Sequence, residues 1–443
     1  MRIVFYSTNS TVYDKENFHY FNFPKCKSNF EKLKLNFPFC DFFVVTQEPG
    51  MFLLDLKKDG FLDKSNKIEY IILPEKLNIF EISEKILELS PDIAISITGF
   101  YKPFDWQGIK DSLIAEELKK HNIKILCNNP KTQNICFNKQ LFQLFLENHN
   151  FKTPKGIYIN HELFWAERNR LEINENVYKE KIFYELEKLK FPVIIKDTTG
   201  LSSFGMEVVS SFREAKSYLL SKKNNADKLV QELIIGEQFG IEIYGTKKNY
   251  TISKPFLFSV NKYKITSPKQ SIKIGPVEKS KYKIKKLNKE ITRLANLLNL
   301  NGIAQIDLVF DGKNWFFIEI NSRISGMTNT VCESFNTNIL ILLTQKALNL
   351  KTKIKKHKIM SIKLPLISEN EFNQLKKIEF IKQINQTENE NAKQKRETGY
   401  CEIIIDEKNG TLKQNLDKLK TNFPNLIEEN FYIQAINMLP ILE

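Results

Sequence analysis

The segment Asn301 to Thr330 constrains this chain more than any other, because it combines a recognisable hairpin with closely spaced acidic and amide side chains. Two runs rich in β-forming residues, Ile303 to Phe310 and Trp315 to Ile320, flank the polar sequence Asp-Gly-Lys-Asn at 311–314. Residues of high β-propensity on both sides of such a turn sequence are typical of a β-hairpin. We therefore predict two antiparallel strands in this segment.

This hairpin is a candidate metal site. Alternate side chains of a strand face the same side of a sheet, so Glu319 and Asn321 are expected to point the same way. Asp307 joins them if it lies opposite Glu319, a register that a loop with an odd number of residues would allow. Two carboxylates and an amide oxygen suit Mg²⁺, with phosphate oxygens completing its coordination. The alternative is an amphipathic hairpin whose acidic side chains face water.

Length and composition indicate a globular protein of several domains. The 443 residues correspond to two to four domains at roughly 150 residues each. The sequence has no apolar run of about 18 residues and no signal-peptide pattern, so a cytoplasmic location without a membrane segment is expected. The six cysteines are far apart and form no CxxC pair, which argues against zinc sites and disulfides.

The net charge of +14 favours anionic partners without choosing among a nucleotide, an acidic small molecule and a nucleic acid. The lysine-rich stretch Lys281 to Lys286 is interpreted as the solvated face of a helix. The sequence has no stripe of alternating aromatic and basic residues of the kind that binds single-stranded nucleic acid. A nucleic-acid-binding module stays a non-enzymatic alternative.

The first part of the chain alternates short apolar runs with helical patterns such as Ile82 to Leu89 and Ile109 to His121. This alternation predicts a parallel sheet with crossover helices. No GxGxxG sequence follows the first run, so a dinucleotide-binding domain is not supported. The predicted strands are Ile3 to Tyr6, Phe42 to Thr46, Ile68 to Leu73, Ile93 to Ile97 and Ile123 to Cys127.

Two lysines in the middle of the chain are candidate phosphate ligands. Lys139 lies where a helix of the region 132–149 is predicted to begin, and Lys196 ends a compact apolar strand that starts at Phe191. A loop of small residues containing Ser202 and Ser203 follows, where backbone N–H groups and hydroxyls could approach a phosphate closely. The alternatives are a surface lysine at position 139 and a flexible hairpin loop.

The segment Leu229 to Ile243 reads as strand, turn and strand, with an apolar turn at which an adenine ring could lie against Leu233 and Ile235. A helix over Lys283 to Leu298 leads into the opening hairpin, and Val331 to Leu348 reads as a buried helix. The last part is predicted as a small α+β unit with a polar loop at 386–398. Its strands are expected at 360–366, 378–384 and 400–405, followed by a helix at 411–420.

With these motifs in order, the chain resembles the ATP-grasp superfamily over roughly Thr132 to Leu348. The resemblance implies a fold class of α/β and α+β: an N-terminal parallel-sheet pre-ATP-grasp domain, a two-subdomain ATP-grasp fold with a lid, and a small C-terminal α+β unit. The implied boundaries are 1–131 for the first domain and 132–355 for the ATP-grasp domain, with the lid at about 155–230. The C-terminal unit would then occupy 356–443.

The resemblance also implies site residues. ATP phosphates would be bound by Lys139, Lys196 and the loop of Ser202 and Ser203, and the nucleoside by Glu232, Leu233 and Gln238. Asp307, Glu319 and Asn321 would carry two Mg²⁺ ions, for which Mn²⁺ could substitute. Arg323 would grip a carboxylate or an acylphosphate, and Arg323 and Lys196 would serve catalysis.

The sequence departs from the family pattern at several positions. Asp197 follows the strand lysine where relatives often have proline, and Gln238 replaces a ribose-binding glutamate. Gln305 stands where D-alanine–D-alanine ligases have arginine, which disfavours that subgroup. The Asn-Ser-Arg sequence ending at Arg323 is closer to the branch of biotin carboxylase and L-amino-acid ligases. Biotin itself is not implied.

The resemblance implies an ATP-dependent, ADP-forming ligase that joins a small-molecule carboxylate, an amino acid or a peptide, to an amine through an acylphosphate. The enzymatic alternative is an ATP-grasp kinase or a carboxylase-like enzyme that stops at phosphoryl transfer. The loop Tyr101 to Gln107 is a candidate wall of the substrate pocket. Nucleic acid is not expected as a partner, and a homodimer is left open.

Overall fold

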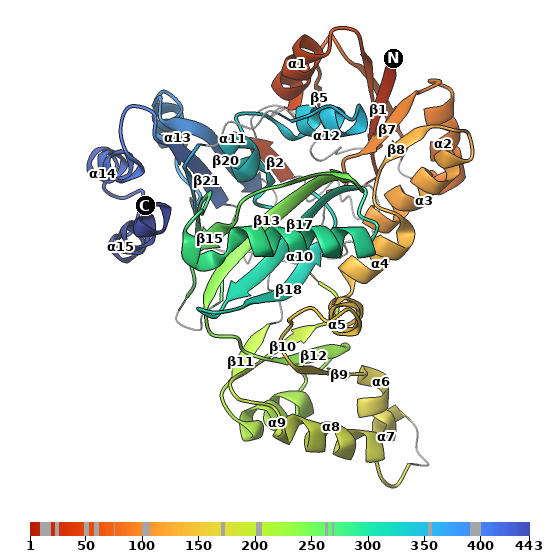
Figure 1. Cartoon of the computed structure of the whole chain (residues 1–443), viewed down its shortest axis with the longest axis vertical. Helices are drawn as coiled ribbons and strands as arrows, with labels where there is room; N and C mark the ends of the chain where they lie inside the picture. The colour runs from red at the N-terminus through yellow and green to blue at the C-terminus, as the bar shows by residue number, and fades with distance from the viewer. Residues whose placement is uncertain are drawn as a thin grey trace.

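The computed structural model describes residues 1–8, 19–22, 26–47, 53–56, 62–74, 76–99, 107–169, 173–200, 206–261, 265–267, 270–352, 357–389 and 400–443. The predicted mixed class of α/β and α+β is confirmed, since a parallel sheet at the N-terminus is followed by antiparallel sheets. Figure 1 shows the parallel sheet near the N-terminus, the large antiparallel sheet in the centre and a smaller sheet with helices at the opposite end.

The N-terminal region forms the predicted five-stranded parallel sheet, in the order β6-β3-β1-β7-β8. Its strands are β1 (Arg2–Ser7), β3 (Asp41–Gln47), β6 (Glu69–Leu73), β7 (Ile93–Ser96) and β8 (Lys124–Leu126). The strand order reverses between β1 and β7. In open parallel sheets, ligands bind at this reversal, outside the carboxyl ends of the strands.

Helices cover both faces of this sheet. The helices α2 (Ile79–Leu87) and α3 (Gln107–Lys119) pack on one face, and α1 (Cys26–Asn36) packs on the other. A helix from much later in the chain, α12 (Ile339–Ala347), lies beside α1 on the same face. The N-terminal sheet is therefore completed by a distant part of the sequence.

Two helices occupy the region in which one was predicted to begin near position 139. They are α4 (Pro130–Phe137) and α5 (Lys139–Asn148). The break lies at Asn138, whose extended backbone ends α4 and whose side chain accepts hydrogen bonds from the first amides of α5. Lys139 is consequently the first residue of a helix, as predicted.

A second, antiparallel sheet with the order β11-β10-β12-β9 lies at the lower end of the molecule in Figure 1. Short helices pack on it through a separate apolar core. The strands are β9 (Gly156–Ile159), β10 (Val193–Asp197), β11 (Glu207–Val209) and β12 (Lys228–Glu232). The helices are α6 (His161–Phe164), α7 (Ala166–Asn169), α8 (Val177–Glu187) and α9 (Phe212–Leu220).

A ten-stranded sheet forms the centre of the molecule, in the order β18-β17-β13-β15-β16-β19-β21-β20-β2, with β14 also paired to β13. Strands of the predicted C-terminal unit continue this sheet through the pairing of β16 with β19. Its strands are β2 (His19–Asn22), β13 (Glu237–Thr246), β14 (Asn249–Ile252), β15 (Phe256–Phe258), β16 (Ser271–Gly275), β17 (Gly302–Phe310), β18 (Trp315–Asn321), β19 (Ile359–Pro365), β20 (Ile381–Asn389) and β21 (Tyr400–Asp406). A short hairpin pairs β4 (Asp55–Leu56) with β5 (Leu62–Asp63).

One face of the central sheet packs on α10 (Ile284–Leu297), whose buried residues recur at helical spacing, as the sequence predicted. The same core includes α13 (Glu369–Leu375), α14 (Leu412–Asn422) and α15 (Glu429–Met438). Two predictions were wrong here. The helix expected at 331–348 is two helices, α11 (Thr328–Ser334) and α12, because Asn336 adopts a positive φ and Asn338 caps the second. The polar loop expected from 386 begins later, because β20 continues to Asn389 and pairs with β2.

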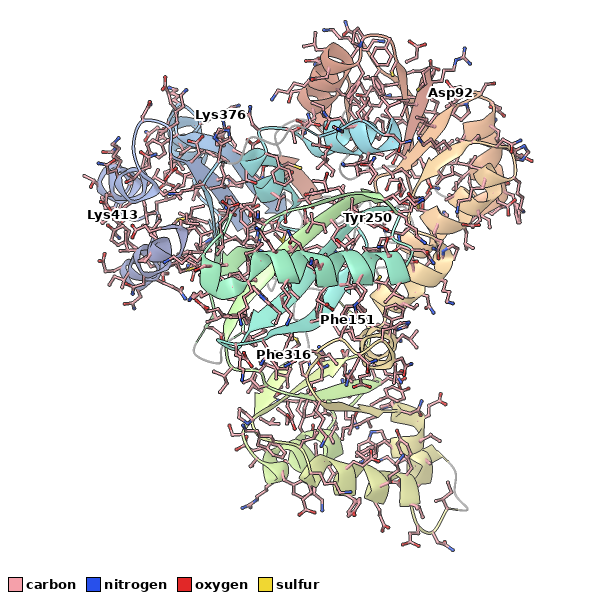
Figure 2. The ribbon with its side chains drawn as sticks, viewed as in Figure 1. Asp92, Phe151, Tyr250, Phe316, Lys376 and Lys413 are labelled. Atoms are coloured by element: carbon pink, nitrogen blue, oxygen red, sulfur yellow. The ribbon has the colours of Figure 1, made fainter. Side chains whose placement is uncertain are left out.

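The lower sheet is attached to the central one by contacts near Phe151 and Phe316, which Figure 2 shows between the two. Lys152 donates a hydrogen bond to Asn314 in the hairpin turn at 2.7 Å. The backbone N–H of Phe317 donates to the carbonyl of Lys152 at 2.8 Å. The strand β18 therefore links the hairpin of the central sheet to the segment that enters the lower sheet.

Candidate functional site

The predicted hairpin is present, but its register arises differently from the prediction. The loop between Phe310 and Trp315 has four residues, not an odd number. Asp307 nevertheless lies opposite Glu319, because the register shifts by one residue between Asp307 and Leu308 and leaves Ile318 as a β-bulge. The prediction of the odd loop was wrong because it assumed two regular strands.

The bulge decides which side chains face the core. Phe317 and Ile320 both lie in the apolar core under α10, although three residues apart on a regular strand would point to opposite faces. Beyond the bulge, Glu319 and Asn321 lie on the side of the sheet away from that core, where Asp307 projects from the neighbouring strand. The extra residue thus brings the three predicted metal ligands to one face.

The two carboxylates form an electrostatically unfavourable pair. Burial, followed by the neighbouring carboxylate of Glu319, raises the pKa of Asp307 to about 7. The side-chain amide of Gln305 donates to Asp307 at 2.5 Å, and the amide of Asn321 donates to Gln305 at 3.1 Å. A hard divalent cation would relieve the repulsion, and these oxygen donors fit Mg²⁺. Three acidic, cysteine or histidine groups do not converge anywhere in the described residues, so the amide of Asn321 would complete the set.

Two lysines flank these carboxylates. Lys196, at the end of β10, is only 4% exposed, and burial lowers its pKa to about 8 despite the attraction of Glu319. The ammonium of Lys139 lies 3.9 Å from Glu319 and donates a hydrogen bond to the carbonyl of Gly200 at 3.0 Å. The structure therefore brings two cations and two carboxylates from four separate elements together, an arrangement suited to a triphosphate with its metal.

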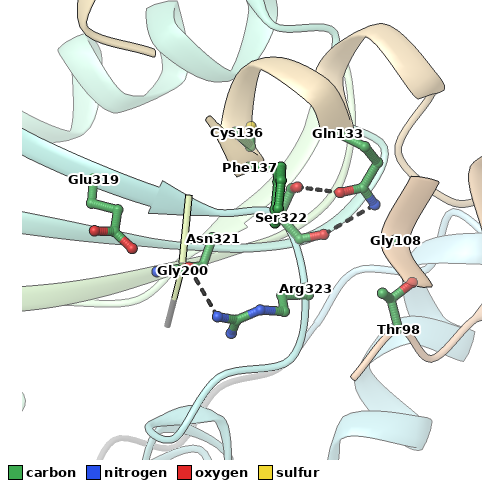
Figure 3. A pocket seen from close by; sticks show the side chains of 10 residues that line it. All are labelled: Thr98, Gly108, Gln133, Cys136, Phe137, Gly200, Glu319, Asn321, Ser322 and Arg323. Carbon is green, nitrogen blue, oxygen red and sulfur yellow. Dashed lines mark hydrogen bonds between the residues drawn. The ribbon is translucent and has the colours of Figure 1, made fainter. Parts of the chain in front are cut away.

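Arg323 lies just beyond β18 and is 9% exposed. Its guanidinium donates to the side-chain oxygen of Asn321 at 3.0 Å and to the carbonyl of Ile324 at 3.1 Å. Figure 3 shows the Arg323 side chain at a pocket that Glu319 and Asn321 also line. The guanidinium is therefore held in place beside the candidate metal ligands.

The pocket is closed on its other side by the N-terminal region and α4. Its lining comprises Thr98, Gly108, Gln133, Cys136, Phe137, Gly200, Glu319, Asn321, Ser322 and Arg323. The side chain of Gln133 receives a hydrogen bond from the Ser322 hydroxyl, and the N–H of Ile324 donates to the carbonyl of Thr98 at 3.0 Å. Thr98 follows β7, beside the reversal of strand order in the parallel sheet. The pocket thus lies between the parallel sheet and the metal-ligand face.

The predicted adenine turn lies at the junction of the lower and central sheets. The Glu232 carboxylate accepts a hydrogen bond from the N–H of Lys190, and the N–H of Leu233 donates to the carbonyl of Pro192, both at 2.9 Å. The Glu232 carboxylate and the Leu233 N–H therefore each have a hydrogen-bond partner within the protein. The Ile235 side chain is 63% exposed at the turn, as an apolar ring-binding surface requires.

Of the other residues predicted to bind the nucleotide, the structure describes Gln238. Gln238 lies on β13, two residues before Gly240, which is paired with Asp307. Its side-chain oxygen accepts a hydrogen bond from Thr266 at 2.9 Å. Ser202 and Ser203 lie outside the described residues, as do positions 101–106 of the candidate pocket wall.

Several residues of the site were not predicted. Thr98 and Gln133 line the pocket from regions with no motif in the sequence, and Glu242 and Lys273 hold the backbone that follows Arg323. Gln305 was noticed only as a difference from another subgroup, although its position two before Asp307 on one strand already placed both on the same face. The other four are brought in by tertiary contacts alone.

A sequence model described as an ATP-grasp domain matches residues 136–327. These residues form an ATP-grasp domain. They include six of the predicted site residues that the structure brings together, from Lys139 to Arg323, and extend from the end of α4 to the loop after β18. The expectation of an ATP-grasp domain in this part of the chain is thereby confirmed.

The chain is also similar to known proteins at low identity. It is 24% identical over 324 residues to the carbamoyl phosphate synthase large chain of Clostridium beijerinckii, a match that covers 68% of this chain and 28% of that protein. The chain therefore spans less than a third of the length of this relative. No helix in the described ranges is long and apolar enough to cross a membrane.

Two solved structures share the fold over nearly the whole chain. The L-amino acid ligase of Bacillus licheniformis is 14% identical with a TM-score of 0.64, covering 96% of this chain and 97% of that one. The biotin carboxylase domain of 2-oxoglutarate carboxylase from Hydrogenobacter thermophilus is 11% identical with a TM-score of 0.63, covering 100% and 98%. At such identities the similarity establishes the fold, which includes the N-terminal and C-terminal regions flanking the ATP-grasp domain.

Proposed function

We propose that this chain is an ATP-dependent, ADP-forming carboxylate–amine ligase. The observation that carries the proposal is the convergence of Lys139, Lys196 and Asp307 around Glu319, which lines one pocket together with Arg323, in an ATP-grasp domain. This set supplies cations for a triphosphate, ligands for its metal, and a fork-shaped cation for a carboxylate. A surface that only binds acidic polymers would not need two carboxylates on the same face.

We assign ATP to the junction of the lower and central sheets. Lys139 and Lys196 bind its phosphates, together with the loop that contains Ser202 and Ser203. The adenine lies at the turn of Glu232 and Leu233, where the exposed Ile235 side chain offers an apolar surface. Gln238 hydrogen-bonds the ribose. In the Hydrogenobacter thermophilus structure the biotin carboxylase domain is in complex with MgADP, which agrees with this nucleotide class.

Asp307, Glu319 and Asn321 would hold two Mg²⁺ ions, with Mn²⁺ as a substitute. When bound, the metal supplies charge neutralisation at the phosphate oxygens. Lys196 is buried beside the same carboxylates, so its ammonium adds positive charge where water is excluded. The residues of the chain therefore prepare the terminal phosphorus for attack by an anionic nucleophile, which the charge of free ATP would repel.

Arg323 positions the substrate carboxylate in the pocket of Figure 3, beside Glu319 and Asn321. An oxygen of this carboxylate attacks the terminal phosphorus, the bond to the bridging oxygen breaks, and ADP leaves with an acylphosphate formed. The nitrogen of an amine then attacks the acyl carbon, inorganic phosphate leaves, and the amine loses a proton. The product is an amide, and we expect an amino acid or a peptide as the substrate.

The test is ADP release by the full chain with ATP, Mg²⁺ and a library of amino acids and short peptides, followed by product masses. The Asp307→Asn and Glu319→Ala variants should lose at least about a thousandfold in turnover, because each removes a charge from the metal site. Glu290→Gln is a matched control, since this carboxylate pairs with Arg293 on α10, across the central sheet. Bound nucleotide without ADP release for any member of the library would contradict the proposal, as would normal turnover in both variants.

The same assay separates the enzymatic alternative. An ATP-grasp kinase or carboxylase-like enzyme would release ADP and yield a phosphorylated or carboxylated product, whereas a ligase yields a product heavier by the amine less water.

The biotin carboxylase domain from Hydrogenobacter thermophilus was crystallised as a dimer. We propose a homodimer for this chain too, which sedimentation equilibrium would test.

A further inference from the structure

The backbone that carries Arg323 forms a loop of its own, residues 322–328, which we call the Arg323 loop. It follows β18 directly and ends at the start of α11. Inside the loop, the N–H of Ser325 donates to the Thr328 hydroxyl at 3.0 Å, and the N–H of Met327 donates to the Ser325 hydroxyl at 3.1 Å. These short-range bonds shape the loop but do not fix it relative to the metal ligands.

One anchor of this loop comes from the sheet below it. Glu242 on β13 is fully buried and accepts hydrogen bonds from the hydroxyls of Ser325 at 2.8 Å and Thr328 at 2.6 Å. Met327 packs so closely on β13 that a Cβ atom at Gly240 would lie 2.6 Å from its sulfur. The floor of the loop is therefore fixed by the strand that neighbours β17.

A second anchor comes from β16, which is backed by the C-terminal strand β21. The ammonium of Lys273 on β16 donates to the carbonyl of Gly326 at 2.6 Å and to the carboxylate of Glu402 on β21 at 2.9 Å. Both side chains are largely buried, at 14% and 8% exposure. The Ser361 hydroxyl, on the strand β19 between them, donates to the same carboxylate at 2.5 Å. A chain of polar contacts thus runs from β21 to the Arg323 loop.

The charge on Glu402 is maintained by this chain. Although burial alone would raise its pKa, the Lys273 ammonium and the Ser361 hydroxyl hold the pKa of Glu402 below the ordinary value for a glutamate. The buried Glu402 carboxylate in turn holds the Lys273 ammonium on one side, so that another N–H of this ammonium points at the loop. Lys273 can therefore fix the Gly326 carbonyl more rigidly than a solvated lysine would.

A third anchor is the bond from the Ile324 N–H to the Thr98 carbonyl. The loop is therefore bonded to the N-terminal region, to β13 and to β16, and it is linked to β21 through Lys273. Among these contacts, the one from Lys273 is the hydrogen bond in which a charged group bonds a backbone atom of the loop. The neighbouring Lys363 provides a comparison, since it lies near Glu402 but its ammonium stacks on the ring of Tyr400 at 3.9 Å.

We infer that Lys273 and Glu402 are positioning residues that set the place of Arg323, so that the C-terminal strands determine how tightly the enzyme binds its carboxylate substrate. This inference rests on the proposed ligase function. It assigns a role in the reaction to the C-terminal strands, none of whose described residues lines the pocket. The effect is expected on binding of the carboxylate and not on binding of ATP, because the phosphate-binding lysines lie on α5 and β10, away from this network.

The first test is hydrogen–deuterium exchange of the full chain over peptides covering 324–330, with Lys273→Met, Lys273→Arg and Lys363→Met. Lys273→Met should raise the exchange rate of this peptide about tenfold, the effect of losing one strong charged hydrogen bond. Lys273→Arg should recover most of the protection, since a guanidinium reaches both partners. Lys363→Met should match the parent protein. Glu402→Gln, which keeps the side-chain shape, should give an intermediate rate if Lys273→Met proves too unstable to purify.

The second test is kinetic, with the carboxylate that supports ADP release in the library. Lys273→Met should raise the KM for this carboxylate about tenfold and leave the KM for ATP within about twofold. Lys273→Arg should restore the lower KM. An equal rise in both constants would overturn the inference, because a merely structural loss does not separate the two substrates.

Exchange outcomes decide the anchor even if no carboxylate supports turnover. A library in which no carboxylate supports ADP release would refute the ligase function. Faster exchange confined to 324–330 in Lys273→Met would still support anchoring of the loop by Lys273. Unchanged exchange in Lys273→Met would overturn the inference. So would faster exchange spread over β13, β17 and β21, which would show that the pair only stabilises the fold.

Discussion

A buried carboxylate in the N-terminal sheet gives a prediction with a definite sign. Asp111 on α3 is fully buried and accepts hydrogen bonds from the hydroxyls of Thr8 at 2.6 Å, Thr98 at 3.0 Å and Ser96 at 3.1 Å. The N–H of Thr8 donates to it as well, at 3.0 Å. It thereby ties together the carboxyl ends of β1 and β7, from which Thr98 reaches the pocket.

The pKa of Asp111 fixes the direction of the effect. Burial raises this pKa from 3.8 to about 6, against the opposing influence of the hydroxyls. A carboxyl with a raised pKa in the folded state binds its proton more tightly there than in the unfolded chain. Its contribution to the unfolding free energy is therefore fully present below pH 3.8 and is lost as the pH rises to 6. The loss corresponds to a shift of about 2 pKa units, or about 3 kcal/mol.

Asp111→Asn removes this titration while keeping the shape of the side chain. The unfolding free energy of the variant relative to the parent should therefore increase by about 2–3 kcal/mol between pH 4 and pH 7.5. Urea denaturation followed by circular dichroism, repeated along that pH range for both proteins, measures the difference. Comparing the two proteins at each pH cancels the titration of all other groups.

Ser96→Ala is the matched variant, because it keeps the carboxyl and removes one hydroxyl that lowers its pKa. The decline in stability between pH 4 and pH 7.5 should become steeper than in the parent, opposite to the effect of Asp111→Asn. Parallel stability curves for Asp111→Asn and the parent protein would refute the reasoning. They would mean that the buried carboxylate is as well stabilised by its hydroxyl partners as it is by water.

Four further variants test the site and the elements that carry it. Gly240→Ala should lower the melting temperature and turnover, because a Cβ there would lie 2.3 Å from the Phe258 ring, whereas Gly326→Ala, whose Cβ meets nothing within 4 Å, should be tolerated. Lys228→Met should lower the unfolding free energy, measured by urea denaturation, by about 1–3 kcal/mol, because it breaks the ion pair with Asp197. The lysine side chain is 2% exposed, whereas the aspartate side chain is 31% exposed and can be partly solvated after the loss. Lys196→Met should weaken ATP binding, measured by calorimetry, at least about tenfold without loss of stability, because a cation whose burial lowers its pKa to about 8 is replaced by an apolar side chain. Tight ATP binding by this last variant would remove Lys196 from the phosphate site.

Local sequence patterns were sufficient for most elements and for the main site residues. The five parallel strands of the N-terminal sheet follow from short apolar runs, and α10 from its helical spacing of buried residues. Lys139 and Lys196 were predicted at the start of a helix and the end of a strand, and the structure has them there. Such features depend on neighbours within a few residues, which the sequence displays directly.

Errors arose where one residue changes the geometry of a longer element. Asn336 interrupts the helix that the apolar pattern suggested was continuous over 331–348, because asparagine tolerates positive φ, and Asn338 then caps a second helix. Ile318 inserts a bulge that periodicity alone cannot reveal, since an apolar residue at that position fits a regular strand equally well. The prediction placed Glu319 on the correct face of the sheet. The reason given was wrong, because the four-residue loop alone would not have placed Glu319 opposite Asp307.

Local motifs were enough to predict the ATP-grasp domain, the order of the candidate phosphate and metal ligands along the chain, and the chemistry that such side chains can perform. Three features came from tertiary contacts that no motif predicted: the C-terminal strands continue the central sheet, Thr98 and Gln133 line the pocket, and Lys273 joins the Arg323 loop to Glu402. The reason is physical. A motif is recorded in residues close together along the chain, whereas the contacts that aim it join residues far apart in sequence, and their pairing is set by how the sheets pack.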